Sequence, residues 1–254
     1  MKIYSWNVNG IRAVQKKGFV EWVQSEEPDI LCIQETKANV EQLEDTLIHI
    51  KGYYSYFHSA KRKGYSGVAV YTKEKPKFVH EKIGIDKFDE EGRILILEYE
   101  CFTLLNIYFP NGQKDDERLS YKLEFYDFIL EYCEKLKKQG KKLVICGDYN
   151  TAHKDIDLKN PKANEDRSGF LPIERAWIDK FISYGYIDTF RYIYPETIKY
   201  SWWSYRFNAR KNNAGWRIDY HFVSDNLINK VKDAQILNEV EGSDHCPVTI
   251  DLDL

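Results

Sequence analysis

The chain alternates short apolar runs with stretches of mixed apolar and polar residues, a pattern that predicts a strand-rich protein. Runs rich in β-branched residues, such as the one that follows Lys142, are typical of buried strands. Further strands are predicted at residues 2–7, 29–34, 53–58, 68–71, 94–98, 102–108 and 248–252, and around Phe78.

Apolar residues recur at helical spacing in fewer places. Helices are predicted from Phe19 up to Pro28, at 40–48, at 119–138 before Gly140, from Pro172 to Ile182 and, briefly, near Leu227. The polar stretch at 151–169 exceeds ordinary connection lengths, so we expect it to be functional or mobile.

Strands dominate both halves of the chain, and each half also contributes helices. This pattern fits two packed sheets with helices outside better than a regular alternation of strand and helix. We therefore predict an α/β (α+β) fold, a four-layered α/β sandwich of two packed, mainly antiparallel β-sheets flanked by helices. No linker interrupts the pattern, so residues 1–254 are expected to form a single domain.

The composition, 43% hydrophobic and 15% aromatic residues, is sufficient for a substantial core. No apolar stretch approaches the length of a membrane span, and a first strand that starts at Lys2 leaves no room for a signal peptide. The 5 cysteines lack zinc spacing and are interpreted as buried thiols rather than as redox groups. These features predict a cytoplasmic, intracellular protein.

The net charge of −3 excludes a protein that binds nucleic acid only by neutralising phosphates, because such a protein would be strongly basic. A carboxylate-rich centre would lower the net charge while local basic loops still contact a phosphate backbone. Such loops occur at 61–63 and 206–211. For either loop alone, solvated surface charge is the better explanation.

Several predicted strands end in polar residues suited to phosphate chemistry. The run after Lys142 ends in Gly147, and then Asp148 and Asn150 can point to the same side of the strand end. Other runs end at Asn7, Glu35, Tyr108 and Asp219, and Asp244 and His245 precede the last strand. A single such end would mean little, so it is their number that indicates one shared active site.

Seven short motifs follow one another along the whole chain, at residues 7–10 (NVNG), 31–37 (LCIQETK), 106–112 (NIYFPNG), 147–150 (GDYN), 208–210 (NAR), 215–220 (GWRIDY) and 242–247 (GSDHCP). Together they resemble the exonuclease III type of AP endonuclease, the DNA-repair branch of the endonuclease/exonuclease/phosphatase superfamily. The resemblance implies incision of double-stranded DNA on the 5′ side of an abasic site, which leaves a 3′-hydroxyl. It also implies 3′→5′ exonuclease or 3′-phosphodiesterase activity on 3′-blocked ends. We further expect a monomer.

The resemblance also implies a divalent metal. Mg²⁺ prefers carboxylate, amide and water oxygens, and Mn²⁺ is expected to substitute for it. Asn7 and Glu35 match the principal metal site of the family. Asp148, Asn150 and Asp244 are further candidate ligands, although Asp244 could instead support the neighbouring histidine.

Attack on a phosphodiester needs an activated water, neutralised charge and a stabilised leaving oxygen. Asp148 is the predicted general base, which deprotonates or aligns the water, and Asn150 holds that water or the phosphate. The resemblance pairs His245, a cation or hydrogen-bond donor toward the phosphate, with Asp219. Tyr108 is expected to hydrogen-bond the phosphate, or to act as an acid if its pKa is lowered.

The recognition of a missing base is assigned to aromatic residues near the C-terminal motifs. In the family, the positions that Trp202, Trp216 and Ile218 match line a small apolar slot for the flipped-out abasic sugar. Trp216 and Ile218 are two apart on one predicted strand, so they share a face. Arg210 and Lys211 are expected to track the phosphates. The alternative is that these aromatic side chains are ordinary core.

Two other functions remain open on the sequence. One is a phosphatase or RNA deadenylase of the same superfamily, against which the motif at 215–220 argues. The other is a nucleic-acid-binding protein that has lost catalysis, against which the complete set of catalytic residue types argues.

Overall fold

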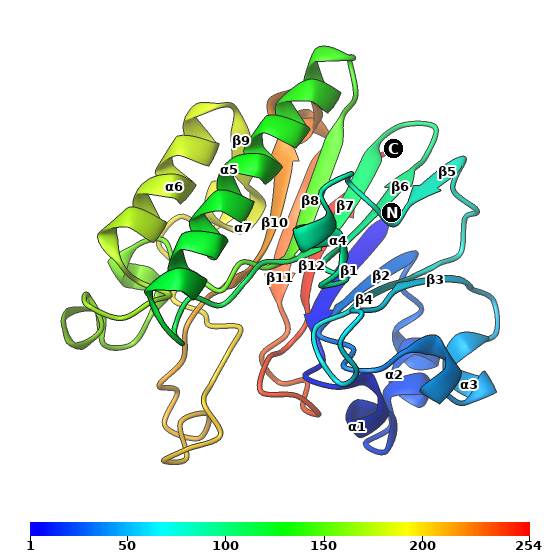
Figure 1. The fold of residues 1–254 in the computed structure, drawn as a ribbon, viewed down its shortest axis with the longest axis horizontal. Helices are drawn as coiled ribbons and strands as arrows, with labels where there is room; N and C mark the ends of the chain where they lie inside the picture. The colour runs from blue at the N-terminus through cyan, green and yellow to red at the C-terminus, as the bar shows by residue number, and fades with distance from the viewer.

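The computed structural model describes residues 1–254 and shows two six-stranded β-sheets packed face to face (Figure 1). The first sheet contains, in spatial order, β11 (Val231–Ile236), β12 (Val248–Leu252), β1 (Lys2–Asn7), β2 (Ile30–Gln34), β4 (Val68–Thr72) and β3 (Tyr54–His58). The second contains β5 (Phe78–His80), β6 (Ile94–Glu98), β7 (Thr103–Tyr108), β8 (Leu143–Asp148), β10 (Asp219–Ser224) and β9 (Tyr186–Asp188). Each sheet has one parallel pair, β1–β2 or β7–β8, and its other pairs are antiparallel.

Helices cover the outer faces of both sheets (Figure 1). The helices α1 (Ile11–Gln15), α2 (Phe19–Glu26) and α3 (Asp45–Ile48) lie beside the first sheet, and α5 (Asp116–Lys138) and α6 (Pro172–Ser183) cover the second. The short helices α4 (Asp86–Asp89) and α7 (Thr189–Ile193) complete the set. The predicted four-layered sandwich is therefore confirmed.

The central strands are buried on both faces, which explains why their sequences are continuous apolar runs rather than alternating ones. In β8, Val144 and Cys146 belong to the core between the sheets. Leu143 and Ile145 point the other way and pack under α5 and α6, against residues such as Phe125. One strand thus serves two cores because its side chains alternate.

The helix boundaries show where apolar spacing is an incomplete guide. The helix α5 begins at Asp116 rather than at the predicted Leu119, because the Asp115 carboxylate caps it by accepting the Arg118 N–H at 2.8 Å. The predicted helix at 40–48 is confirmed only in part, as two short helical segments. A 3₁₀ turn at Val40–Gln42 is separated from α3 because the backbone between them is extended.

The short helices α1, α4 and α7 were not predicted, because each has five residues or fewer and shows no full amphipathic period. None of the helices combines the length and the apolar character that crossing a membrane requires. All five cysteines are free thiols, and four are buried, which confirms that prediction except at the exposed Cys101.

The strand ends explain where the polar residues gather. The ends of β1, β2, β7 and β8 and the starts of β10 and β12 lie at one edge of the sandwich, because β10 is antiparallel to β8 and β12 to β1. Asp219 therefore begins β10 instead of ending a strand, which corrects the sequence prediction, and it lies opposite Asp148. The chain termini lie together at the other end, where the Met1 amino group donates to the Leu252 carbonyl at 2.7 Å (Figure 1).

The loop at 151–169 is anchored from beneath by buried charges. Arg217 donates hydrogen bonds to Asp157 and Asp188, both at 2.7 Å, and Arg191 donates to Asp157 at 2.6 Å. Burial acts to raise the pKa of Asp157, but Arg217 and Arg191 outweigh it and hold this pKa at about 2, below the ordinary 3.8. The ion pairs tie the loop to the sheet behind the cavity described below.

Asp157→Asn should lower the free energy of unfolding above pH 5, and this deficit should shrink as the pH falls. A carboxylate with a lowered pKa stabilises the fold while ionised, and this contribution is lost as protonation proceeds toward pH 2. The ionisation is worth about 2 kcal/mol. Urea unfolding of both proteins at pH 5, 4 and 3 measures the difference, with exposed Asp155→Asn as the control. If the difference in free energy of unfolding between the two proteins were the same at every pH, the lowered pKa of Asp157 would be contradicted.

Candidate active site

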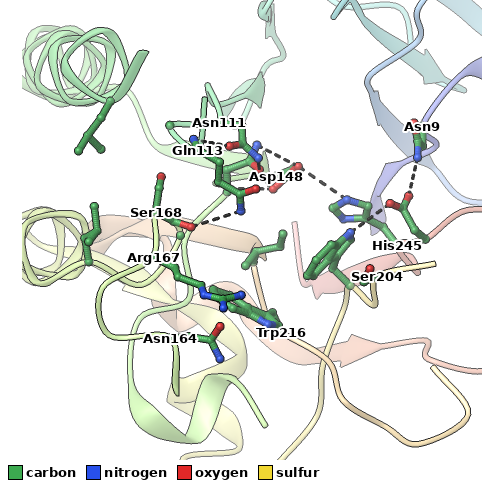
Figure 2. A pocket seen from close by; sticks show the side chains of 18 of the residues that line it. Asn9, Asn111, Gln113, Asp148, Asn164, Arg167, Ser168, Ser204, Trp216 and His245 are labelled. Atoms are coloured by element: carbon green, nitrogen blue, oxygen red, sulfur yellow. Dashed lines mark hydrogen bonds and ion pairs between the residues drawn. The ribbon is translucent and has the colours of Figure 1, made fainter. Parts of the chain in front are cut away.

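A cavity of about 1170 Å³ opens at the edge where the strand ends meet (Figure 2). The sequence-predicted residues that line it are Glu35, Tyr108, Asp148, Asn150, Trp202, Trp216, Ile218, Asp244 and His245. Asn7 and Asp219 are buried and are hydrogen-bonded to Asp148 and His245, respectively. The structure thus brings together residues from both sheets that are far apart in the chain.

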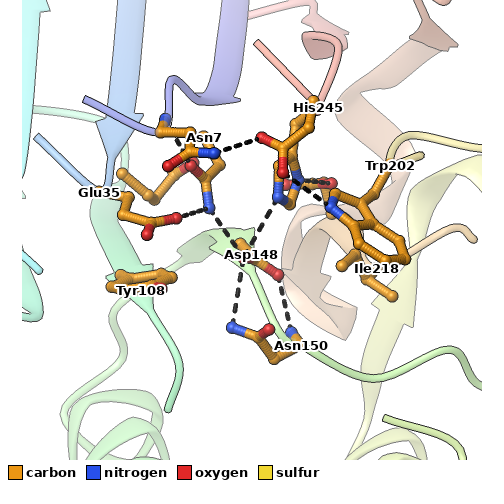
Figure 3. A network of polar contacts seen from close by, with 12 residues as sticks. Asn7, Glu35, Tyr108, Asp148, Asn150, Trp202, Ile218 and His245 are labelled. Carbon is orange, nitrogen blue, oxygen red and sulfur yellow. Dashed lines mark hydrogen bonds and ion pairs between the residues drawn. The ribbon is translucent and has the colours of Figure 1, made fainter. Parts of the chain in front are cut away.

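The centre of the site is an imidazole between two carboxylates. His245 Nδ1 lies 2.9 Å from Asp219 Oδ2, and His245 Nε2 lies 3.9 Å from Asp148 Oδ2 (Figure 3). The Ser201 hydroxyl donates to the same Asp219 oxygen at 2.6 Å. The indole N–H of Trp6 donates to the His245 backbone carbonyl at 3.1 Å, so the ring is held from several sides.

The charges of this trio follow from burial and proximity. Burial acts to lower the pKa of His245, but Asp219 and Asp148 outweigh it and raise this pKa to about 10, so the ring is an imidazolium at neutral pH. Burial, followed by the repulsion of Asp219, raises the pKa of Asp148. A raised pKa makes Asp148 a stronger base than an ordinary carboxylate.

Unusual backbone conformations at Gly147 and Asn150 fix the positions of Asp148 and Asn150. Gly147 precedes Asp148 with φ 142°, and a Cβ there would collide with the Ile107 carbonyl, so only glycine is compatible. Asn150 adopts a left-handed backbone with φ 51°, and its N–H donates to Asp148 Oδ1 at 2.8 Å. Its side-chain amide donates to the Phe109 carbonyl at 2.9 Å.

A second group of oxygen ligands lies on the first sheet. The Asn7 amide nitrogen donates to both Glu35 and Asp148 at 2.9 Å (Figure 3). Glu35 has φ 60°, a left-handed backbone that is uncommon for a residue with a side chain and is typical of functional sites. The Lys37 ammonium lies 2.8 Å from the other Glu35 oxygen.

These residues fit a hard divalent cation. Two carboxylates and one amide supply oxygen ligands without sulfur or free imidazole nitrogen. The Asn7 oxygen accepts the Asn9 N–H at 2.9 Å, and the Asn7 nitrogen faces the carboxylates. For the oxygen to bind a metal between the carboxylates, the side-chain amide must rotate so that its oxygen and nitrogen exchange places. Asp148, Asp219 and His245 also place ligand atoms within 4.8 Å of one another, but the His245–Asp219 ion pair already occupies that trio.

Tyr108 lines the cavity beside Glu35 (Figure 3). Burial, followed by the negative charges of Glu35 and Asp148, raises the pKa of Tyr108 well above its ordinary value. A raised pKa favours the predicted role of the hydroxyl as a hydrogen-bond donor over that of an acid with a lowered pKa. The Arg93 guanidinium lies 4.9 Å from the centre of the tyrosine ring and donates to the Tyr108 carbonyl at 2.9 Å.

The opposite wall of the cavity is aromatic. Trp202 and Trp216 exchange backbone hydrogen bonds of 2.9 Å, and their rings meet edge to face with centroids 6.2 Å apart. Both cover a small apolar cluster that includes Ile218 and Phe170. The strand predicted for Trp216 and Ile218 is wrong, because both precede β10, yet both side chains line the cavity.

Arg210 and Lys211, the two residues predicted to track the phosphates, lie outside the cavity. Arg210 donates to three backbone carbonyls in the segment 238–243, so its guanidinium is occupied within the protein. Lys211 is exposed and does not line the cavity. The basic residues that do line it include Arg167 and Arg206.

Asp244 has a supporting position. Its carboxylate accepts the indole N–H of Trp202 at 3.1 Å and the amide of Asn9 at 3.0 Å. Its negative charge also raises the pKa of the adjacent His245, after the larger effects of the other two aspartates. Both of its oxygens have N–H donors, which favours the supporting role over that of a second metal ligand.

Several contributing residues had no role in the sequence analysis. Lys37 forms an ion pair with Glu35, and the Ser201 hydroxyl donates a hydrogen bond to Asp219. The Asn111 amide donates to Asn150 Oδ1 at 3.1 Å. Lys37 and Asn111 lie inside the motifs at 31–37 and 106–112, so the motifs could have indicated that these two residues belong to the site. Ser201 shows no pattern of its own, because only the folded structure brings it beside Asp219.

A two-sheet sandwich that presents carboxylates, amides and an imidazolium in one cavity is suited to the hydrolysis of phosphate esters. The chain belongs to the endonuclease/exonuclease/phosphatase family, whose model matches residues 4–245. It is accordingly a hydrolytic nuclease, as the sequence predicted.

The chain is similar to DNA-processing enzymes along its length. It is 44% identical to an exodeoxyribonuclease of Bacillus subtilis over 252 residues, 98% of each chain. It is 43% identical to a DNA-(apurinic or apyrimidinic site) endonuclease of Dictyostelium discoideum, over 100% of this chain and 71% of that protein. The structure of a 3′ phosphatase from Neisseria bound to a product DNA hairpin matches with a TM-score of 0.91, at 28% identity and 100% coverage of both chains.

Asp219→Asn should lower the pKa of His245, because the substitution removes the carboxylate that most stabilises the imidazolium. The titration should move down by about one unit or more. NMR of the imidazole signals between pH 5 and 11, with metal chelated, measures this pKa. His58, which is bonded to the Ile94 carbonyl, serves as the internal control. Identical His245 titrations in the two proteins would rule out the pairing as the cause of the high pKa.

Proposed function

We propose that the chain is a Mg²⁺-dependent DNA-repair phosphodiesterase that incises double-stranded DNA on the 5′ side of abasic sites and leaves a 3′-hydroxyl. The 3′→5′ exonuclease or 3′-phosphodiesterase activity on 3′-blocked ends belongs to the same proposal. The observation that carries it is one cavity in which the Trp202–Trp216 wall adjoins the Asp148–His245 centre, with the rings of Trp202 and His245 6.4 Å apart.

The ionised residues account for the hydrolytic step. Glu35 and Asn7 would hold the metal, with Asp148 beside them, and the metal would supply positive charge to the phosphate. The His245 imidazolium donates a hydrogen bond and a charge to a phosphate oxygen. Asp148 accepts the proton of the attacking water, which Asn150 helps to orient. The new P–O bond replaces the bond between phosphorus and the 3′-oxygen, which leaves as the 3′-hydroxyl after it takes a proton from solvent. The Tyr108 hydroxyl donates a hydrogen bond to the phosphate.

The aromatic wall accounts for the choice of an abasic site. A deoxyribose without a base has lost its stacking and pairing, so its extrusion into the cavity costs little. An intact nucleotide must first give up a few kcal/mol of stacking and pairing. Its base then meets the rings of Trp202 and Trp216 beside Ile218. The wall therefore excludes normal nucleotides instead of binding a specific base.

The partner in this proposal is double-stranded DNA. The relatives named as an exodeoxyribonuclease and an apurinic or apyrimidinic site endonuclease support it, as does the neighbour solved with a DNA hairpin. We propose a single domain, because one family model matches residues 4–245, and we propose that it acts as a monomer. An enzyme with this substrate acts inside the cell, and we propose the cytoplasm.

The direct test is incision of a labelled duplex that carries one tetrahydrofuran abasic analogue. We expect a single cut on its 5′ side with Mg²⁺ and none with EDTA. Asp148→Asn should slow turnover by about three orders of magnitude or more, because the base acts in the transition state. Glu35→Ala should raise the Mg²⁺ concentration needed for half-maximal rate. Metal-independent cutting, or an intact duplex in every condition, would refute the proposed function.

Trp216→Ala should keep the fold and the metal requirement but reduce the preference for abasic over intact duplex by about tenfold or more. The smaller side chain opens the wall that excludes a base. The measurement is the ratio of kcat/KM on the two duplexes. Tyr132→Ala on α5, which removes an aromatic ring that does not line the cavity, is the matched control. An unchanged ratio in folded Trp216→Ala would assign Trp216 to the core alone.

A further inference from the structure

A fully buried ion pair lies directly behind the site and has no role in the chemistry described above. Lys122 on α5 and Glu174 on α6 are both 0% exposed, and their charged groups are 2.6 Å apart. Burying two charges is costly unless geometry and hydrogen bonds compensate for it. The hydrogen bonds of Lys122 and Glu174 therefore indicate which parts of the structure the pair stabilises.

Lys122 holds the chain that leaves β8. Its ammonium donates to Glu174, to the Asn150 carbonyl at 2.8 Å and to the Thr151 hydroxyl at 2.8 Å. All three of its N–H donors are thus used. The Asn150 carbonyl belongs to the left-handed residue whose side chain lies beside Asp148, so Lys122 fixes the backbone of a candidate catalytic residue.

Glu174 holds the rim of the cavity. Its carboxylate accepts the Ser168 hydroxyl at 2.9 Å and the N–H groups of Gly169 and Leu171 at 2.6 and 3.1 Å. These three residues line the cavity. The pair therefore joins the segment 168–171 to the end of β8.

Gly169 connects this rim to the aromatic wall. It has φ +101°, and a Cβ there would lie 3.2 Å from the Trp216 ring and 3.4 Å from the Asn150 carbonyl oxygen. Its own carbonyl accepts the Ala152 N–H at 2.8 Å. Gly169 thus lies close to both Asn150, which is proposed to orient the water, and Trp216, which is proposed to exclude bases.

We propose that Lys122 and Glu174 are a positioning pair that sets the catalytic end of β8 relative to the wall of the abasic slot. The inference rests on the proposed function. Neither charge faces the cavity, so the pair acts on the substrate only through Asn150 and the segment 168–171. Its loss should lower the rate of cleavage more than it weakens DNA binding, because alignment matters most in the transition state.

The test uses Lys122→Met/Glu174→Gln, which removes both charges together and leaves no unpaired one. The single-turnover rate on the abasic duplex should fall about 10- to 100-fold, while the Kd for the same duplex in EDTA changes by less than about twofold. Asp127→Asn/Lys180→Met is the matched control, because that pair also joins α5 to α6 but lies at the surface. It should cleave at the wild-type rate.

A double-mutant cycle separates positioning from a general structural role. Adding the double substitution to Asn150→Ala should cost less than it costs in the wild type, because the part of its effect that passes through the Asn150 side chain has already been removed. Additive losses, or a wild-type rate in the folded double variant, would overturn the proposal. If the double variant does not fold, Glu174→Asp retains both charges but shortens the reach to Gly169. A wild-type rate in that variant would overturn it equally.

The outcomes also separate this inference from the proposed function. Rates are measured in parallel on the abasic duplex and on a duplex with a 3′-phosphate. A wild-type chain that cuts neither substrate refutes the proposed function. If the wild type cuts one of them and the double variant cuts it equally fast, the proposed function stands and the positioning role is refuted.

Discussion

The structure depends on one charged hydrogen bond, between His245 and Asp219, in a region from which water is largely excluded. A buried imidazolium is stable only if carboxylates lie close to it, and Asp219 and Asp148 meet this requirement from adjacent strands. The bond joins the start of β10 to the segment before β12, and therefore one sheet to the other. The whole edge of the sandwich is arranged so that this contact can form.

The remaining site residues are held by support from behind. Glu35 and Asn150 adopt left-handed backbones that cost energy. Asn7 donates a hydrogen bond to the Glu35 carboxylate, and Lys122 donates one to the Asn150 backbone carbonyl. Arg93 holds the Tyr108 carbonyl and lies against its ring. Such pre-formed positions need little rearrangement when a substrate arrives, which is how a rigid scaffold contributes to rate.

The cavity separates two tasks that the proposed reaction requires. Its charged groups, at the strand ends, are suited to an anionic phosphate, and its aromatic wall is the part that we propose excludes an intact base. The two parts come from different kinds of structure, since Asp148 ends a central strand whereas Trp202 and Trp216 lie in paired loops. Lesion preference can therefore vary through the loops without disturbing the centre that performs hydrolysis.

The sequence by itself determined the class of fold, most strand positions and the residues at the centre, because apolar runs and the polar residues that end them are local signals. It could not show that Asp219 begins a strand, that Arg210 is turned toward the segment 238–243, or that Ser201 supports Asp219. Those facts depend on antiparallel register and on contacts between segments distant in the chain. The charges of His245 and Asp148 were likewise decided by the tertiary structure, since burial and neighbouring carboxylates set their pKa values.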